Sequence, residues 1–395
     1  MSASPSALQR RLRGRSRRPG GEPAPDVPFF DLAPMHDPLK AQILADVARV
    51  IDEGAFTNGA AVRAFEEAFA DYCGVDHCVG VGSGLDALRL GLLASGIEPG
   101  DEVLVPAATF VATFEAVTQA GGRPVIVDVS ESDYTIDPDA VRAAAGPRTR
   151  FIVPVHLYGQ LADMRALRRV ADAAGLAIVE DACQAHGARR DGITAGASGV
   201  ASAFSFYPGK NLGAFGDAGA LVTVDGEVAA RVRALREHGQ VEKYEHEVEG
   251  YTSRLDTIQA AVLLRKLSLL DEWNEQRRQA AAFYSEALRG VGDLVLPPRV
   301  PRNDPVWHLY VVRTREVGGL RRFLAAAGIG TGRHYPTPVH LSGAYAWLGH
   351  PRGSFPVAEA LCDEGLSLPL FPGIAAWQLE RVVESIRCYF GDGSR

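Results

Sequence analysis

The chain has few cysteines, no long apolar run and no excess of positive charge, and each of these absences excludes a class of protein. Five cysteines in 395 residues do not make a disulfide framework, which favours a reducing compartment and predicts a cytoplasmic protein. No uninterrupted apolar run reaches the roughly eighteen residues of a membrane span, so no membrane partner is expected. The formal net charge of -7 argues against a surface that binds nucleic acid.

Residues 1–25 form a basic tail that differs in composition from the rest of the chain. The tail carries six arginines and one acid, Glu22, and Ser, Pro and Gly fill the gaps between them. It contains no apolar stretch of the kind found in a secretory signal. We therefore expect a disordered Arg-rich tail in preference to an arm that binds nucleic acid.

Short apolar runs alternate with helical patterns from residue 28 onward. The run at 77–82 is followed by Leu85, Leu88 and Leu92, which recur on one face of a helix. Further buried strands are predicted at 102–106, 124–129, 151–156 and 176–181. Continuous apolar strands separated by helices are typical of an α/β protein with a mostly parallel sheet covered on both faces. In such sheets the ligand lies beyond the carboxyl ends of the strands.

The last third of the chain predicts a smaller α+β domain. A long helical pattern covers about residues 256–278, and a strand at 307–313 and a helix at 319–327 follow it. We divide the chain into the tail at 1–25, a large domain at 26–270 and a small C-terminal domain at 271–395.

A glycine-rich turn lies between the first strand and its helix, with the sequence Gly82-Ser83-Gly84. The glycines allow a tight turn, and the free N–H groups at a helix start bind anions such as phosphate. A turn that holds no ligand is an equally good interpretation of this motif alone. The G-x-G-x-x-G spacing of dinucleotide-binding proteins is not met, which argues against a nicotinamide-dependent dehydrogenase.

Two charged residues stand in apolar surroundings. Asp181 ends the strand at 176–181, where a carboxylate is costly to bury unless a cation meets it. The alternative is an acid that caps the next helix. Lys210 is the only Lys or Arg between Asp191 and Arg231. It is either a buried amine of lowered pKa, suited to Schiff-base chemistry, or a surface lysine whose stem lies on apolar neighbours.

A phosphate-binding helix start, a strand-end aspartate and an isolated lysine are together the fixed points of a pyridoxal 5'-phosphate site. The helix start holds the phosphate. The aspartate pairs with the pyridine nitrogen and keeps it protonated, and the lysine holds the aldehyde carbon as an imine. The sequence therefore predicts pyridoxal 5'-phosphate as the cofactor. Cys73 and Cys78 have no second ligand pair nearby, and no metal is expected.

Six motifs occur in order along the chain: FTNG (56–59), PAATFVAT (106–113), PVHLYGQ (154–160), EDACQAHG (180–187), FSFYPGKNLG (204–213) and SRLD (253–256). With these motifs the chain resembles the DegT/DnrJ/EryC1/StrS family of sugar aminotransferases from Phe29 to about Pro372. The resemblance implies the fold-type I aminotransferase architecture. It also implies a homodimer whose two active sites lie at the subunit interface.

The resemblance assigns a role to each matching residue. It makes Lys210 the Schiff-base lysine and Asp181 the pyridinium partner. It implies that Gln184 hydrogen-bonds the ring oxygen and that Phe110 stacks on the ring. The implied phosphate contacts are Ser83, Gly84 and Ser205. The family usually has Asn where this chain has Thr252, whose shorter side chain would have to reach the neighbouring subunit's phosphate.

Transamination is the reaction that the resemblance implies, because relatives that dehydrate deoxysugars carry histidine at the position of Lys210. Glutamate is the expected amino donor, and a nucleotide-linked keto sugar is the expected acceptor. The phosphate loop is most similar to that of enzymes that aminate C3 of dTDP-3-keto-6-deoxyhexoses in the biosynthesis of deoxyaminosugars. C4-aminating sugar enzymes and cyclitol aminotransferases share most motifs and stay as alternatives. A non-catalytic nucleotide-sugar-binding regulator, suggested by the basic tail alone, is the alternative from another class.

Substrate contacts are also carried over from the resemblance. Tyr207, His334 and Tyr335 are expected to line the sugar pocket, although 334–336 is also compatible with a simple turn after a strand. Lys243 and Tyr244 are expected to reach the nucleotide diphosphate of the partner subunit. A solvated loop is the alternative for these two residues.

Overall fold

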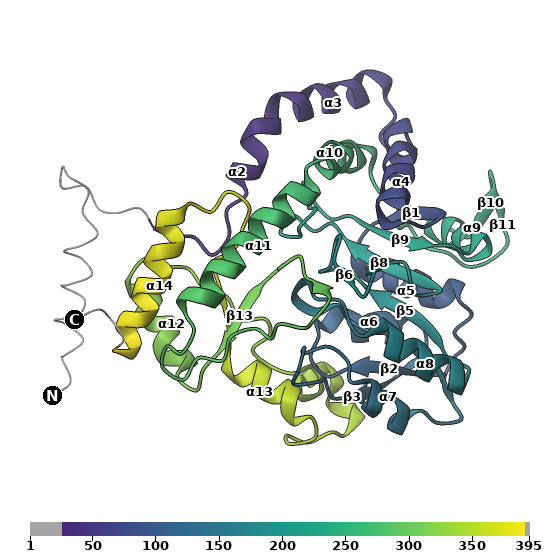
Figure 1. The fold of residues 1–395 in the computed structure, drawn as a ribbon. Coiled ribbons are helices and arrows are strands. Elements are labelled where there is room, and N and C mark those ends of the chain that lie inside the picture. Colours follow the sequence, from purple (N-terminus) through teal and green to yellow (C-terminus); the bar gives the residue numbers. More distant parts are fainter. Residues whose placement is uncertain (1–25, 392–395) are drawn as a thin grey trace.

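The computed structural model describes residues 26–391 of the chain. The predicted Arg-rich tail at 1–25 lies outside the described residues, as do residues 392–395. Figure 1 shows a central sheet with helices on both sides of it and a group of C-terminal helices, coloured green to yellow, beside the sheet.

A seven-stranded sheet in the order β1-β9-β8-β5-β4-β2-β3 forms the centre of the fold. β9 is antiparallel to both of its neighbours, and the pairs between β8 and β3 are parallel. The strands are β1 (His77–Val81), β2 (Glu102–Pro106), β3 (Arg123–Val127), β4 (Thr149–Ile152), β5 (Ala177–Asp181), β8 (Ala201–Ser205) and β9 (Gly219–Thr223). The predicted mostly parallel α/β sheet is thus confirmed.

Helices bury this sheet from both faces. One apolar cluster includes residues of α5 (Gly84–Ala94), α6 (Val111–Gln119) and α9 (Gly226–Arg236). A second includes residues of α4 (Ala60–Cys73), α7 (Pro138–Ala144), α8 (Met164–Ala174) and α10 (Thr257–Leu267). Successive strand residues alternate between the clusters, as Val103 and Val105 join the first and Leu104 the second. Strand ends are therefore held between two packed layers of helices.

The C-terminal part adds an α+β unit with its own apolar cluster. β13 (Tyr310–Arg313) pairs antiparallel with β14 (Gly365–Leu368). Around this pair pack α11 (Leu270–Ala287), α12 (Val317–Ala326) and α14 (Ala376–Phe390). α13 (Pro356–Glu364) instead places Ala358 and Leu361 in the first cluster of the sheet. α13 thereby ties the C-terminal part to the sheet.

The long helical pattern predicted over about 256–278 is divided between two helices in the structure. α10 ends at Leu267 and α11 begins at Leu270. The Ser268 hydroxyl donates to the Arg265 carbonyl at 3.2 Å, a side-chain bond that competes with continuation of the helix. The break lets α10 pack on α3 (Lys40–Glu53) and α4 while α11 runs toward the C-terminal helices (Figure 1).

The remaining elements are short. They are α2 (Ala33–His36), β6 (Arg189–Arg190), β7 (Ile193–Thr194), β10 (Gln240–Glu242), β11 (Glu245–His246), β12 (Asn303–Asp304), η1 (Asp37–Leu39), η2 (Leu157–Gly159), η3 (Val339–Leu341) and η4 (Gly343–Leu348). Among the helices of residues 26–391, none combines the length and the apolar character that crossing a bilayer requires.

Candidate active site

The start of α5 lies directly against the end of β8. A Cβ atom on Gly84 would lie 2.6 Å from Cβ of Ser205 and 2.7 Å from Sγ of Cys183, so only glycine fits there. Ser83 caps the helix, because its Oγ accepts the N–H of Asp86 at 3.1 Å. The N–H groups of Gly84 and Leu85 head the helix, where helical geometry gives them no partner. The predicted phosphate residues Ser83, Gly84 and Ser205 are thus brought together at an anion-binding helix start.

Asp181 is a buried carboxylate at the end of β5, 7% exposed. Its Oδ2 accepts the hydroxyl of Thr113 at 2.8 Å, and its Oδ1 accepts the N–H of Cys183 at 3.2 Å. Thr109 in turn shares a hydrogen bond of 2.7 Å with Thr113. No described basic side chain forms an ion pair with Asp181, although Lys210 is close enough for its charge to be felt. The carboxylate is therefore oriented and still lacks a cation.

Lys210 lies on the loop that follows β8. Burial lowers the pKa of Lys210, and the nearby Cys183 and Asp181 raise it only in part. Among residues 26–391, Cys183 and Asp181 are the ionisable groups whose charges act on the Lys210 amine. A neutral amine is the nucleophilic form of lysine, so the surroundings favour covalent chemistry at this atom.

Gln184 links the sheet to the segment around residue 335. Its side-chain oxygen accepts the N–H of Tyr158 at 2.8 Å, and its Nε2 donates to the hydroxyl of Tyr335 at 3.1 Å. The hydroxyl of Tyr158 donates to the carbonyl of His334. The rings of Phe110 and Tyr335 lie 5.2 Å apart between centroids. The structure thus brings the predicted residues Phe110, Gln184, His334 and Tyr335 into one connected group.

Burial sets the protonation of the aromatic side chains in this group. It lowers the pKa of His334 to about 4, with the charge of Lys210 acting in the same direction. Nδ1 of His334 shares a hydrogen bond of 2.8 Å with the hydroxyl of Ser367. Burial also raises the pKa of Tyr335, and the charge of Asp181 adds to the shift. At neutral pH His334 is therefore neutral and Tyr335 keeps its hydroxyl proton.

Four predicted contact residues are exposed or lie apart from this group within one chain. Tyr207 is 59% exposed. Lys243 and Tyr244 lie in the β10–β11 hairpin, where Nζ of Lys243 sits 5.3 Å from the centroid of the Tyr244 ring. Thr252 is exposed and its Oγ1 shares a hydrogen bond of 3.1 Å with Nε2 of His238.

Several residues that support the site were missed by sequence reasoning. Thr113 and Tyr158 lie inside the quoted motifs, but a motif does not reveal that a hydroxyl 68 positions away reaches Asp181. Asn211 follows Lys210 and its amide donates to Oδ1 of Asn274 and to the carbonyl of Val306, both at 2.9 Å. Only the long-range packing of the chain shows these partners.

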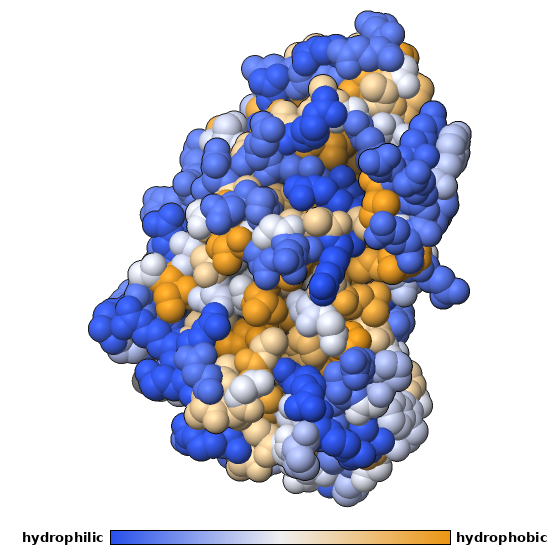
Figure 2. All heavy atoms as spheres, turned by 90° about the vertical axis from the view of Figure 1, so that its right-hand side faces the viewer, coloured by the Kyte–Doolittle hydropathy of each residue, from blue (hydrophilic) through white to orange (hydrophobic). Residues whose placement is uncertain are grey.

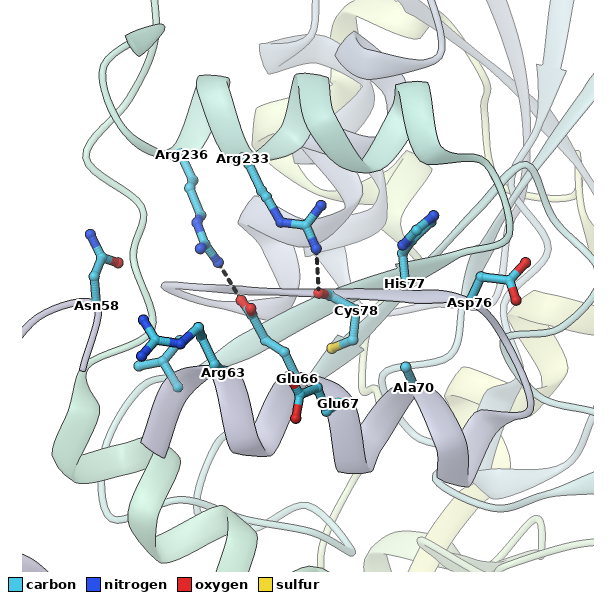
Figure 3. A pocket seen from close by; sticks show the side chains of 11 residues that line it. Asn58, Arg63, Glu66, Glu67, Ala70, Asp76, His77, Cys78, Arg233 and Arg236 are labelled. Carbon is cyan, nitrogen blue, oxygen red and sulfur yellow. Dashed lines mark hydrogen bonds and ion pairs between the residues drawn. The ribbon is translucent and has the colours of Figure 1, made fainter. Parts of the chain in front are cut away.

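A separate pocket of about 390 Å³ lies at the outer edge of β1 (Figure 3). Glu66 accepts the N–H of Gly80 at 2.7 Å, and Arg236 donates to Glu66 and to the carbonyl of Gly80, both at 2.6 Å. Arg233 donates to the carbonyl of Cys78 at 3.4 Å. These side chains satisfy the free backbone groups of an edge strand, a structural role distinct from the Lys210 site. No group of His, Cys, Asp and Glu suited to a metal ion is found among residues 26–391.

Together, the fold and the site define the class of the protein. A mostly parallel sheet whose strand ends carry a helix start with free N–H groups, a buried aspartate and a lysine of lowered pKa fits the arrangement of fold-type I pyridoxal-phosphate enzymes. The chain matches the model of the DegT/DnrJ/EryC1/StrS aminotransferase family over residues 37–387, and it belongs to that family.

The similar proteins include sugar aminotransferases and a protein of antibiotic biosynthesis. The chain is 51% identical over 92% of its length to dTDP-3-amino-3,4,6-trideoxy-alpha-D-glucose transaminase of Streptomyces venezuelae, of which 96% is covered. It is 50% identical over 92% of its length to the erythromycin biosynthesis sensory transduction protein EryC1 of Saccharopolyspora erythraea, of which 99% is covered. The crystal structure of S. venezuelae DesV in complex with a ketimine intermediate superposes with a TM-score of 0.90 at 51% identity, covering 92% of this chain and 98% of DesV.

The protein is therefore a sugar aminotransferase that uses pyridoxal 5'-phosphate. The residues present fit this cofactor. Asp181 is a buried anion without a cation, the start of α5 presents free N–H groups beside Ser205, and burial lowers the pKa of the Lys210 amine. When bound, pyridoxal phosphate supplies an aldehyde that takes up the amino group and a ring that accepts electrons.

Proposed function

We propose that the protein transfers the amino group of glutamate to C3 of a dTDP-linked 3-keto-6-deoxyhexose. The observation that carries the proposal is the joint placement of Lys210 and Asp181 at the strand ends beside the α5 start. The named product of the 51% identical S. venezuelae relative has its amino group on C3, which supports C3 in preference to C4. Glutamate as donor follows from family likeness.

Each site residue has a distinct task in this reaction. Nζ of Lys210 moves a proton at the substrate carbon that bears the nitrogen, and burial favours the neutral amine that this step needs. Asp181, held by Thr113 and the N–H of Cys183, keeps the ring nitrogen of the cofactor protonated. Ser83, Gly84 and Ser205 bind the phosphate, Phe110 stacks on the ring, and Gln184 bonds its oxygen.

The substrate contacts include residues from a second copy of the chain. We assign Tyr207, His334 and Tyr335 to the sugar, Lys243 and Tyr244 to the nucleotide diphosphate of the partner's site, and Thr252 to the partner's cofactor phosphate. Within one chain, the side-chain contacts found for Lys243, Tyr244 and Thr252 among the described residues are with each other or with His238, and not with Lys210 or the residues around it. A homodimer with shared active sites gives these residues a task.

Exposed apolar side chains support the homodimer. Figure 2 shows hydrophobic surface, in orange, across the middle of one face between hydrophilic ends. Large exposed apolar residues occur on α3, before α4, on the loop after β8 and near the β10–β11 hairpin; they include Leu44, Ile51, Phe56, Tyr207, Phe215, Val241, Tyr244 and Val248. Exposed apolar side chains that gather on one face are typical of protein interfaces.

We also propose the domain limits of the chain and its cellular compartment. The separate apolar cluster formed mainly by residues after 280 supports a large domain at 26–270 and a small domain from 271 onward. All five cysteines are free, as expected of a reducing cytoplasm.

The test is a reaction with glutamate and a panel of acceptors. Purified protein with bound cofactor is incubated with dTDP-3-keto-6-deoxyhexose, its 4-keto isomer and a cyclitol ketone, and products are identified by mass and NMR. We expect amination at C3 only, with Lys210→Ala inactive on every acceptor. Preference for the 4-keto isomer or the cyclitol would overturn the substrate assignment. An active Lys210→Ala variant would overturn the role of Lys210.

A further inference from the structure

Lys266 is a buried basic residue that no step above uses. It lies on α10 and is 0% exposed, so its ammonium group has no access to water. Nζ donates to the carbonyl of Gly213, and it lies 3.1 Å from Nε2 of His36. The rings of Phe215 and Trp273 lie 5.6 and 5.8 Å from Nζ, within the range of cation–π attraction.

The amine of Lys266 is the donor in both of its hydrogen bonds. Burial lowers the pKa of Lys266 to about 8, which leaves it mainly charged at neutral pH. Burial, with the charge of Lys266, lowers the pKa of His36 to about 4, so neutral His36 accepts at Nε2. No acidic side chain of the described residues pairs with this ammonium group. Its charge is compensated by a backbone carbonyl, an imidazole and two rings.

The carbonyl that Lys266 binds belongs to the loop of the reactive lysine. Gly213 follows Lys210 by three residues, and a Cβ on Gly213 would lie 2.3 Å from the carbonyl oxygen of Pro208. The loop therefore closes tightly around Lys210. On its other side Asn211 is fixed by Asn274, Val306 and His308. On the Gly213 side the loop is held by Lys266 and by the N–H of Ala214, which donates to the carbonyl of Phe206 at 2.8 Å.

We propose that Lys266 is a positioning residue, whose hydrogen bond to the Gly213 carbonyl fixes the direction of the Lys210 amine toward the cofactor. The proposal rests on Lys210 being the reactive lysine. Holding a loop with a buried charge costs free energy, because the charged group must be desolvated. What Lys266 provides is a strong, directed donor that also joins the loop to α2, through His36, and to α11, through Trp273.

The test compares Lys266→Met with Arg265→Met. Methionine fills similar space without a donor, whereas Arg265 lies next to Lys266 and makes a partly exposed pair with Asp46 at 2.8 Å. For Lys266→Met we expect kcat to fall about 10- to 100-fold, as a misdirected reactive group does. KM for the nucleotide sugar stays within about threefold, because the sugar residues are untouched. Arg265→Met keeps wild-type kcat.

A second readout follows the amine of Lys210 directly. The visible band of the bound cofactor is titrated against pH, and its midpoint is expected to move in Lys266→Met and to stay in Arg265→Met. Lys266→Gln, which keeps an N–H donor, should recover part of kcat and replaces the Met variant if that variant does not fold.

The outcomes separate the two proposals. If folded Lys266→Met keeps both kcat and the band midpoint, Lys266 is structural only and this inference is overturned. If Lys210→Ala keeps the visible band and the activity, the role of Lys210 is wrong instead, whatever Lys266→Met does.

Discussion

Glu180 offers the sharpest test of how the site is built, because a fully buried carboxylate there receives five hydrogen bonds. Oε1 accepts the N–H groups of Ser198 and Gly199 and the hydroxyl of Ser202, at 2.7, 2.6 and 3.0 Å. Oε2 accepts from Nε2 of His156 at 2.9 Å and from the N–H of Gly196 at 3.1 Å. The N–H of Ala162 points at Nδ1 of His156, so Nε2 carries the hydrogen.

Glu180→Gln changes one oxygen of this carboxylate into a donor. The retained oxygen can serve the side with three donors, and the new NH₂ group then faces Nε2–H of His156 and the N–H of Gly196. Two charge-assisted bonds are lost and two buried donors are left unpaired. We expect a loss of about 3–5 kcal/mol in the free energy of unfolding. Urea unfolding of the cofactor-free protein at pH 7, at one fixed protein concentration, measures it.

Glu102→Gln is the matched control. Glu102 is 15% exposed and pairs with Arg148, which is 72% exposed, and a pair with one solvent-exposed partner contributes about 1 kcal/mol. If Glu180→Gln unfolds within about 1 kcal/mol of the wild type, the hydrogen bonds described here do not hold the loop at 196–202, and the reasoning fails.

The effect of Glu180→Gln on stability is expected to depend on pH. Burial alone would raise the pKa of Glu180, but the hydrogen bond from His156 and those from backbone N–H groups outweigh it and hold the pKa below 4.5. A carboxylate of depressed pKa stabilises the fold fully above pH 4.5, and this contribution is lost as pH falls through the folded-state pKa. The stability difference between wild type and Glu180→Gln should therefore shrink below pH 4.5. A difference that is constant down to the acid transition would contradict this sign.

Two further substitutions test the cofactor side of the site. Thr113→Val removes the hydroxyl that donates to Asp181 and should lower the free energy of unfolding by about 1.5–3 kcal/mol in a urea titration. Thr118→Val on the same helix is the control and should lower the free energy of unfolding by less than about 0.5 kcal/mol, because that hydroxyl bonds chiefly to its own helix. Equal losses of stability in the two variants would refute the role given to the Thr113 hydroxyl. Gly84→Ala places a Cβ 2.6 Å from Cβ of Ser205 and should weaken cofactor binding in an absorbance titration, so unchanged affinity would show that the α5 start does not hold the phosphate.

Some strand positions were predictable because buried parallel strands are continuous apolar runs, but the strand predicted at 151–156 is β4 at Thr149–Ile152, and β8 and β9 were not predicted. β2 was predicted over its full length, and β5 to within one residue. The topological rule for such sheets predicts that Asp181 and the Gly82–Gly84 turn lie at one edge of the sheet. Lys210 was singled out by its isolation among apolar residues, and burial lowers its pKa in the structure.

Partners that depend on tertiary packing could not be predicted. The donors of Glu180 come from residues 16 to 24 positions away, on segments with no pattern that points to a carboxylate. The Lys266 to Gly213 bond spans 53 positions and depends on where α10 ends. That end was itself missed, because the apolar spacing through 256–278 continues across the break at Ser268. Helix ends depend on side-chain bonds to the backbone as well as on periodicity.

β5 carries two adjacent acids with different tasks, and the geometry of a strand explains why. Glu180 and Asp181 are neighbours, so their side chains point to opposite faces of the sheet. The carboxylate of Glu180 accepts hydrogen bonds from five protein donors. Asp181 accepts from two, so its carboxylate can still pair with a cation. Glu180→Gln should therefore destabilise the fold, while Asp181→Asn should leave a folded protein whose cofactor ring is no longer held protonated. If Asp181→Asn instead unfolds the chain and Glu180→Gln abolishes turnover without loss of stability, this division of tasks is reversed.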